Sequence, residues 1–226
     1  VIIICNIDQG SGEIKLVSVF RDTYLSVSDN GLYNKINQAY FLGGPKQAVE
    51  ALNRNLDLQI DDFATFNWKA VVDAVNILGG VDVELSKAEF YYINAYITET
   101  VEATGVGSYQ LKQAGLNHLD GVQAVAYARL RKMDTDFART ERQREIIDLC
   151  FQKLKKSDFA VVNNVMEAVF PQILSSVTID DIIPAAKNLT KYTIADTMGF
   201  PAARSDANMG KKGACVIPQT LESNVT

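Results

Sequence analysis

The chain has 226 residues, of which 47% are hydrophobic and 22% are charged, and this balance excludes wholesale disorder. The 22 Lys and Arg residues are outnumbered by 27 Asp and Glu residues, giving a formal net charge of −5, which disfavours a general nucleic-acid binder. The longest aliphatic run, residues 1–4, is far too short to cross a bilayer, and no signal-peptide pattern is present. A first residue other than Met, already inside a strand-like run, suggests a trimmed chain.

The N-terminal third of the chain predicts a hairpin followed by a helix. Residues 1–7 form a continuous apolar run, which is typical of a strand buried on both faces, and residues 14–20 predict a second strand after a turn. A short helical stretch from Lys35 stops at Gly43 and Gly44. Pro45 then suits the first turn of a helix of about three turns.

The remaining segments continue to alternate between strand and helix patterns. We expect strands at residues 60–66 and 81–85, a flexible insertion at 98–110, a turn at 116–121, and extended pieces at 200–201 and 215–218. Helices are expected at 68–78, 86–97, 121–129, 136–156, 158–170 and 178–191. Ser86 and Glu89 have capping-box spacing at the start of the second of these helices, and Asp120-Gly121 is expected to open the third. This alternation predicts an α/β fold, and without an obvious linker we expect a single domain over residues 1–226.

The cysteine and histidine residues give little support for a metal site, a redox site or nucleophilic catalysis. Cys5, Cys150 and Cys215 are far apart with no C-x-x-C pair, so zinc fingers and thioredoxin-like sites are disfavoured, and we expect free thiols that act as small core residues. His118 is the only histidine and no G-x-S-x-G motif accompanies it, which disfavours a nucleophilic hydrolase. No phosphate-binding G-x-x-x-x-G-K-[ST] loop exists either.

The segment from residue 129 to 144 has the most unusual charge. It contains six basic residues against three acidic ones inside an acidic chain, and five of the six are Arg, whose planar fork matches phosphate or carboxylate oxygens in pairs. The basic residues are Arg129, Arg131, Lys132, Arg139, Arg142 and Arg144.

The helical periodicity of residues 136–156 places part of this charge on the inward face. The apolar stripe that includes Ile146 and Cys150 continues back by three and four residues to Gln143 and Arg139. Because burying these groups unpaired would cost several kcal/mol, they predict a cleft, water or an anionic partner near the helix N-terminus. Arg129 and Arg131 can face one cleft only if the preceding helix ends between them.

The alternative is that these arginines lie on a solvated face and pair with Asp134, Asp136 and Glu141. This alternative is preferred for Arg144, because Asp148 lies four residues on, and Lys132 is expected in solvent. Arg21 and Asp22 follow a strand, where α/β folds often bind ligands, although a simple surface ion pair is the competing interpretation.

An ordered set of short motifs resembles the LytR-CpsA-Psr family, with order and spacing matched over about residues 1–156. The pieces are Val17-Ser18-Val19-Phe20-Arg21-Asp22-Thr23-Tyr24, Lys35-Ile36-Asn37-Gln38-Ala39-Tyr40, Val72-Asp73-Ala74 with Leu78-Gly79-Gly80-Val81, Ala114-Gly115 with Leu119-Asp120-Gly121, Ala126-Tyr127-Ala128-Arg129-Leu130-Arg131, and Asp136-Phe137-Ala138-Arg139-Thr140-Glu141-Arg142-Gln143. Residues 157–226 match more loosely and are taken as the C-terminal helices and strands of the same domain.

The resemblance implies a three-layer α/β/α domain with a central mixed β-sheet, outside the cytoplasmic membrane and held there by an N-terminal helix absent from this sequence. It also implies a phosphotransferase that moves a phosphorylated glycopolymer, such as wall teichoic acid or capsule, from a polyprenyl-pyrophosphate carrier to a cell-wall acceptor, usually peptidoglycan. Nucleic acid is not an expected partner.

The resemblance also assigns candidate site residues. Position by position, the phosphate-contacting set becomes Arg21, Lys35, Arg129, Arg131, Arg139 and Gln143, with Asp22, Asn37 and Arg142 as further substrate contacts. Mg²⁺ is the expected cofactor. The aspartate that the family associates with the metal would fall immediately before Val1, which puts metal binding by these residues in doubt, and Phe20 replaces a common proline.

Three other functions stay open at this point. A polyprenyl-pyrophosphate hydrolase would use water as the acceptor, and a non-catalytic module would only bind an anionic lipid or polymer. A nucleic-acid regulator could bind a phosphate backbone through the arginines of residues 129–144, although the negative net charge of the chain disfavours this function. The residues of an isoprenoid groove are not chosen, since Phe63, Phe66, Trp68 and Phe90 could equally be core.

Overall fold

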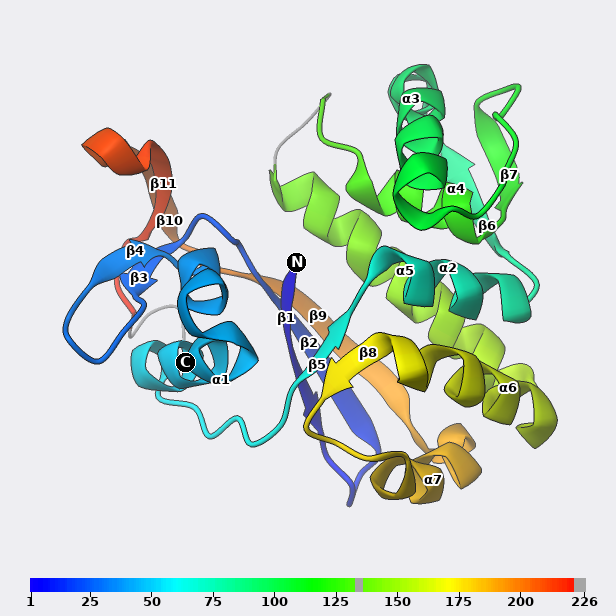
Figure 1. The fold of residues 1–226 in the computed structure, drawn as a ribbon, viewed down its shortest axis with the longest axis horizontal. Helices are drawn as coiled ribbons and strands as arrows, with labels where there is room; N and C mark the ends of the chain where they lie inside the picture. The colour runs from blue at the N-terminus through cyan, green and yellow to red at the C-terminus, as the bar shows by residue number, and fades with distance from the viewer. Residues whose placement is uncertain (133–135, 222–226) are drawn as a thin grey trace. The chain divides into compact units, whose positions relative to one another are not determined.

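Residues 1–132 and 136–221 are described by a computed structural model, and their contacts fall into two compact units (Figure 1). Unit 1 comprises Val1–Phe63 with Ile194–Thr226, and unit 2 comprises Ala64–Thr193. In the described ranges no helix combines the length and the apolar character needed to cross a membrane.

Unit 1 is built on the predicted N-terminal hairpin. Its elements are β1 (Ile2–Ile7), β2 (Glu13–Val19), β3 (Tyr24–Ser26), β4 (Tyr33–Lys35), α1 (Asn37–Leu56), β9 (Thr193–Phe200, whose first residue belongs to unit 2), β10 (Arg204–Asn208) and β11 (Ala214–Pro218). Strands β1 and β2 pair antiparallel, from Ile2 opposite Val19 to Ile7 opposite Ile14, in a sheet of order β1-β2-β9.

Two expectations about β1 are wrong. The strand is not buried on both faces, because it pairs only with β2 in the described sheet, and its C-terminal half is exposed. Cys5 is therefore an exposed free thiol, whereas Cys215 is buried as expected and Cys150 is half-buried.

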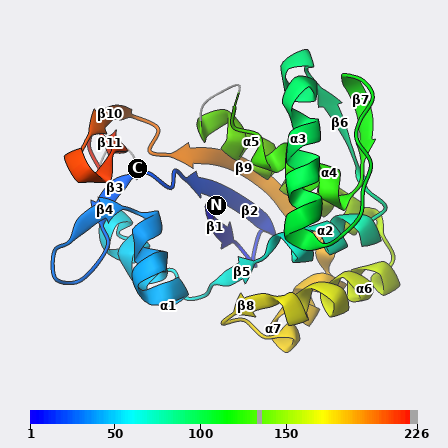
Figure 2. The ribbon, with the colours of Figure 1, turned by 45° about the horizontal axis from the view of Figure 1, so that its top comes forward.

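Helix α1 confirms the predicted interruption. Gly43 and Gly44 leave helical geometry, with Gly44 at φ 68°, and Pro45 resumes the helix. The helix lies against the β3–β4 hairpin (Figure 2). Its apolar stripe joins the strands in one core, which consists of Val19, Leu25, Val27, Ile36, Ala39, Ala51, Leu52, Leu56 and Phe200.

Unit 2 is mainly helical. Its elements are β5 (Ala64–Phe66), α2 (Trp68–Ile77), β6 (Val81–Leu85), α3 (Lys87–Thr104), β7 (Gly115–Leu119), α4 (Gly121–Arg129), α5 (Asp136–Lys156), α6 (Phe159–Val169), β8 (Ile173–Ser175) and α7 (Ile179–Lys187). The pairs β6–β7 and β5–β8 are both antiparallel, and helix α3 connects β6 to β7. Strand β5 is shorter than the predicted residues 60–66, and α7 stops before the predicted residue 191.

Capping residues fix the helix starts that position the site. Ser86 and Glu89 form the predicted capping box of α3, and Asp120 and Gln123 form a second one at α4. The expected flexible insertion at residues 98–110 is partly wrong, since α3 continues to Thr104 and ends at Gly105 in left-handed geometry.

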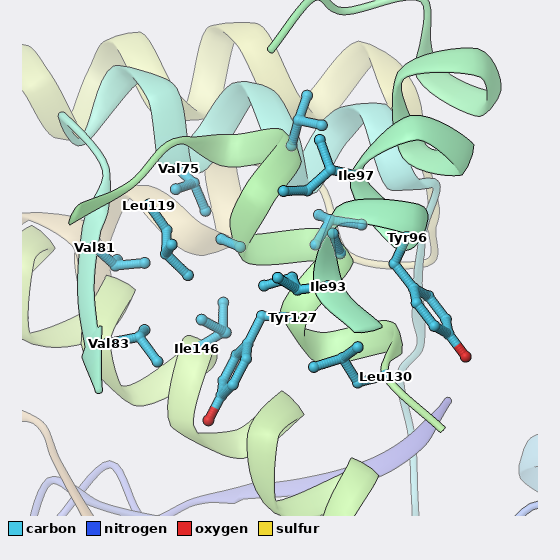
Figure 3. Packing of buried hydrophobic residues seen from close by; sticks show 14 of the residues in the cluster. Val75, Val81, Val83, Ile93, Tyr96, Ile97, Leu119, Tyr127, Leu130 and Ile146 are labelled. Atoms are coloured by element: carbon cyan, nitrogen blue, oxygen red, sulfur yellow. The ribbon is translucent and has the colours of Figure 1, made fainter. Parts of the chain in front are cut away.

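Helices α2 to α5 and the β6–β7 pair enclose the largest core (Figure 3). The side chains of Val81, Val83 and Leu119 from the strands meet Ile93 and Ile97 from α3. The end of α4 and the middle of α5 contribute Tyr127, Leu130 and Ile146 to the same cluster. The segments that carry the candidate arginines are therefore attached to the largest core cluster of unit 2.

Candidate functional site

The N-terminal half of α5 carries a polar face that is buried. Arg139 is 8% exposed and Gln143 is 7% exposed, and Ile146 continues the same face into the core. The prediction that a guanidinium and an amide extend the apolar stripe inward is confirmed. The Gln143 side chain donates to the carbonyl of Ala128 at 3.2 Å, and its Oε1 has no hydrogen-bond partner in the part of the chain that the structure describes. A buried acceptor without a hydrogen-bond partner is uncommon in folded proteins.

Helix α4 ends where the sequence argument required. Arg129 is its last residue, and Leu130 turns away from helical geometry at φ −51° and ψ 131°. Arg131 therefore follows outside the helix and is exposed, as is Lys132. Because the helix ends between Arg129 and Arg131, their side chains do not have to point in the different directions that residues i and i+2 take within a helix.

Three neighbours orient the Arg129 guanidinium. Nη1 donates to Thr100 Oγ1 at 2.8 Å, and Nη2 lies 3.4 Å from Glu99 Oε2, both on α3. The guanidinium carbon lies 5.6 Å from the ring centroid of Trp68, at the start of α2. Sequence reasoning did not identify these contacts, because they depend on how α2, α3 and α4 pack.

Arg142 is held inside unit 2. Its Nε is 3.1 Å from Glu89 Oε1, its Nη1 donates to the carbonyl of Leu130 at 3.3 Å, and it lies 5.9 Å from the Tyr127 ring centroid. It thus links α5 to the start of α3 and to the residue between Arg129 and Arg131. Its predicted contact with substrate stays a prediction. The capping-box spacing singled out Glu89 but gave no signal for this ion pair.

The expectation for Arg144 is wrong. Its side chain is buried, and Asp148 Oδ1 instead accepts a hydrogen bond from Gln152. The reason is that other segments cover more than one side of α5. Fewer of its side chains therefore face solvent than in a helix that buries a single apolar stripe. Burial lowers the pKa of Arg144, while Glu141 opposes this shift. Asp134, proposed above as a partner for the arginines, lies outside the described residues, as does the side chain of Asp136.

We call Arg129, Arg131, Arg139, Arg142, Gln143 and Arg144 the α4–α5 cluster, and three of its cations, Arg139, Arg142 and Arg144, are buried. Tyr127 adds a neutral donor at its border, since its hydroxyl donates to Glu145 Oε2 at 2.8 Å and burial raises its pKa. Burying several guanidinium groups is costly unless anions compensate them. The arrangement suits an anionic ligand.

Unit 1 brings together its four predicted residues. Asp22 Oδ2 lies 3.4 Å from Arg21 Nε and Asp22 Oδ1 lies 3.2 Å from Lys35 Nζ. The backbone N–H of Asn37 donates to the carbonyl of Arg21, and Asn37 Oδ1 is buried without a hydrogen-bond partner in the described ranges. These residues, Arg21, Asp22, Lys35 and Asn37, form what we call the Asp22 cluster. Phe20, which precedes it, packs under Arg204 at 4.9 Å.

His118 is not in a turn, because residues 115–119 form β7. Its Nδ1 lies 2.7 Å from Asp82 Oδ1 and its Nε2 lies 2.8 Å from the carbonyl of Gly79. Both ring nitrogens are thus engaged in linking β7 to β6 and to the turn before it. This structural role agrees with the argument against a histidine-based hydrolase.

Magnesium, the expected cofactor, stays a prediction. No group of three or more His, Cys, Asp or Glu side chains in residues 1–132 and 136–221 could hold a metal ion. Asp22 is the only carboxylate among the predicted site residues, and both of its oxygens face cations.

The LytR_cpsA_psr family model matches residues 1–210. The chain belongs to the LytR_cpsA_psr family. Among its relatives are the polyisoprenyl-teichoic acid–peptidoglycan teichoic acid transferases TagU of Halalkalibacterium halodurans, 28% identical over 85% of this chain and 62% of the relative, and TagV of Bacillus subtilis, 28% identical over 92% and 52%. An uncharacterized protein of Staphylococcus aureus is 31% identical over 82% of this chain and 44% of its own length. This family member thus spans about half the length of the curated relatives it matches.

Solved structures agree with this assignment of fold. TagT bound to LIIa-WTA has a TM-score of 0.76 at 24% identity, covering 98% of this chain and 80% of that one. The protein gbs0355 from Streptococcus agalactiae has a TM-score of 0.79 at 25% identity, covering 95% and 73%. The predicted α/β fold class, with a mixed sheet, is confirmed for this family member.

Proposed function

We propose that the chain is the catalytic part of a transferase that moves a phosphorylated glycopolymer from a polyprenyl-pyrophosphate carrier to a cell-wall acceptor such as peptidoglycan. Relatives named polyisoprenyl-teichoic acid–peptidoglycan teichoic acid transferases support this choice and favour wall teichoic acid over capsule as the cargo. The observation that carries the proposal is the burial of Arg139 and Gln143 on one face of α5.

The chemistry needs cations more than it needs a nucleophilic side chain. The acceptor hydroxyl oxygen attacks the phosphorus nearer the sugar, the bond from that phosphorus to the bridging oxygen breaks, and polyprenyl phosphate leaves. The hydroxyl proton passes to water. Negative charge grows on the leaving phosphate, and preorganised guanidinium groups stabilise it without further rearrangement.

In unit 2 the roles follow from burial and from the existing contacts. Arg139 and Arg129 bind phosphate oxygens, since α5 and the Thr100 contact fix their directions. Gln143 orients a non-bridging oxygen by donating the Nε2 N–H that does not go to Ala128. Arg131, exposed beyond the end of α4, is the adaptable member of the set, and Arg142 positions α5 through Glu89.

In unit 1 we propose that Arg21 and Lys35 bind phosphate oxygens, which displace the Asp22 carboxylate from both cations. Asn37 orders the backbone of Arg21. Magnesium is kept as a proposed cofactor on the family resemblance alone, and no step above depends on it. Comparing transfer rates in magnesium and in chelator tests it.

We also propose an extracytoplasmic site of action at the cell wall, with attachment to the membrane through an N-terminal anchor. Lipid-linked donor and wall acceptor would both be within reach there. Fractionation of cells that make the whole protein tests this proposal, and recovery in the cytoplasmic fraction contradicts it.

The decisive experiment incubates the protein with a polyprenyl-pyrophosphate-linked glycopolymer, with and without peptidoglycan. A transferase attaches the polymer to peptidoglycan and releases polyprenyl phosphate only when the acceptor is present. A hydrolase releases both products without acceptor. Binding without turnover, with magnesium supplied, would reject both enzymes in favour of a non-catalytic module.

A further inference from the structure

The outer face of the β3–β4 hairpin carries two tyrosines beside Lys35. Tyr24 lies opposite Lys35 in the pairing of the two strands, and Tyr33 lies opposite Ser26. Because side chains alternate across a strand and paired residues share a face, both tyrosines and Lys35 project from the same face. Leu25, on the opposite face, is buried in the core of unit 1. The two rings lie 6.0 Å apart between centroids at an angle of 36°, and Tyr33 is 50% exposed.

The β10–β11 hairpin places a lysine over this pair of tyrosines. The two hairpins meet where the Val216 N–H donates to the carbonyl of Asp22, and they lie side by side in both views (Figures 1 and 2). In the turn between β10 and β11, Lys212 Nζ donates to Tyr24 Oη at 3.0 Å and to the carbonyl of Tyr33. It also lies 4.9 Å from the Tyr24 ring centroid. An ammonium group has three N–H donors, so Lys212 can donate to a ligand while it keeps these contacts.

The charge around the two tyrosines is positive. The β10–β11 hairpin, residues 204–218, contains three basic residues and one acidic residue. Lys211 is exposed next to Lys212, and the Asp22 carboxylate already lies 3.2 Å from Lys35. Such a surface attracts a ligand that carries carboxylates or other anionic groups.

The turn of the β3–β4 hairpin disfavours a lipid surface as this ligand. Residues 28–31 of the turn are polar or glycine, and the Asp29 side chain is 83% exposed. A bilayer that covered the neighbouring Leu32, which is 42% exposed, would have to desolvate Asp29 and its partner Arg54 at a cost. A saccharide suits the tyrosines better, because its C–H face can stack on a ring while its hydroxyl groups contact polar neighbours.

We propose an acceptor subsite that binds the carboxylate-bearing glycan of peptidoglycan and consists of Tyr24, Tyr33, Lys211 and Lys212. One saccharide stacks on the tyrosines, and the lysines bind carboxylates of the attached peptide. This inference rests on the proposed function and adds to it the place of the acceptor. Because Tyr24 lies directly opposite Lys35, a saccharide on its ring brings hydroxyl groups beside a cation that we propose to bind phosphate.

Direct binding tests the subsite without turnover. The probes are a disaccharide-peptide released from peptidoglycan and the same fragment with its carboxylates amidated. In calorimetry we expect Tyr33→Ala to weaken binding of the first fragment about tenfold, because a stacked ring contributes on the order of one tenfold step. Its affinity for inorganic pyrophosphate should stay unchanged, which shows that unit 1 is folded. Lys211→Gln should remove the preference for the fragment with free carboxylates. Tyr91→Ala on α3 and Lys15→Gln on β2, both at exposed side chains, are the matched controls and should bind like the wild type.

Steady-state kinetics give a second measurement. Tyr33→Ala should raise KM for the peptidoglycan acceptor about tenfold and leave KM for the lipid-linked donor unchanged. Tyr33→Phe should behave like the wild type, since the stacking ring is kept. A rise in the KM of the donor alone would assign the tyrosines to the donor and overturn the acceptor subsite.

Three further results separate the subsite from the proposed function. Equal binding of the fragments by the wild type, Tyr33→Ala and Lys211→Gln would remove the subsite, while continued transfer would leave the proposed function intact. If Tyr33→Ala instead lost binding to phosphatidylglycerol vesicles and kept the fragments, this face would be a membrane contact and the subsite would be wrong. Fragment binding that depends on Tyr33, without any transfer by the wild type, would support the glycan site and remove the proposed function.

Discussion

The two groups of cations differ in how their charge is compensated. In the Asp22 cluster of unit 1, one carboxylate lies beside both Arg21 and Lys35, and all three side chains are partly exposed. In the α4–α5 cluster of unit 2, Arg139, Arg142 and Arg144 are buried, and Glu89 forms the ion pair with Arg142. Exposed pairs exchange partners at little cost, whereas buried cations are set in place when the protein folds. The first group can rearrange around a ligand, and the second is preorganised for one.

The largest effect is expected from Arg142→Ala, which breaks the buried ion pair. It leaves the half-buried Glu89 carboxylate without its cation, and removing one partner of such a pair costs about 3–5 kcal/mol of the free energy of unfolding. Urea unfolding measures this loss. The control is Arg54→Ala in unit 1, whose partner Asp29 is mostly exposed, and it should cost less than about 1 kcal/mol. Equal losses would show that the contrast in burial has no energetic consequence.

Arg139→Ala should reduce the rate of glycopolymer transfer roughly 10²-fold, because charge-assisted bonds to phosphate are lost in the transition state. The initial rate with a lipid-linked donor is the measurement. Lys156→Ala, which removes an exposed cation at the other end of α5, is the matched control and should retain the wild-type rate. A folded Arg139→Ala protein that transfers at a normal rate would reject the role of the buried face.

The close packing of α4, which carries part of the α4–α5 cluster, against α2 depends on one glycine. A Cβ on Gly121, at the start of α4, would lie 2.1 Å from the carbonyl oxygen of Val72 on α2. Gly121→Ala must therefore push the two helices apart, with a loss of about 1–3 kcal/mol in unfolding free energy. Gly107→Ala, where nothing lies within 4 Å of the added carbon, is the control. If both variants unfold at the same urea concentration, the close approach of α2 and α4 is not a constraint.

The sequence predicted correctly those features that depend on a single helix or a single turn. The period of α5 predicted the burial of Arg139 and Gln143, and local capping chemistry predicted the starts of α3 and α4. It failed where distant segments meet. The burial of Arg144 depends on what covers a second side of α5, and residues 116–119, predicted as part of a turn, form part of a strand because β6 pairs with them. The partners of Arg129 likewise come from two other helices, and no local period encodes them.

The smallest effect on stability is expected in the Asp22 cluster, and its direction for ligand binding is opposite to that of the other variants. Asp22→Asn removes the carboxylate that competes with phosphate for Arg21 and Lys35, so affinity for inorganic pyrophosphate should rise several-fold while unfolding free energy changes by less than about 1 kcal/mol. Calorimetric titration measures the affinity, and Arg21→Ala should weaken it. If Asp22→Asn also weakens binding, the carboxylate holds the two cations in position rather than screening them, and the exposed group is then as preorganised as the buried one.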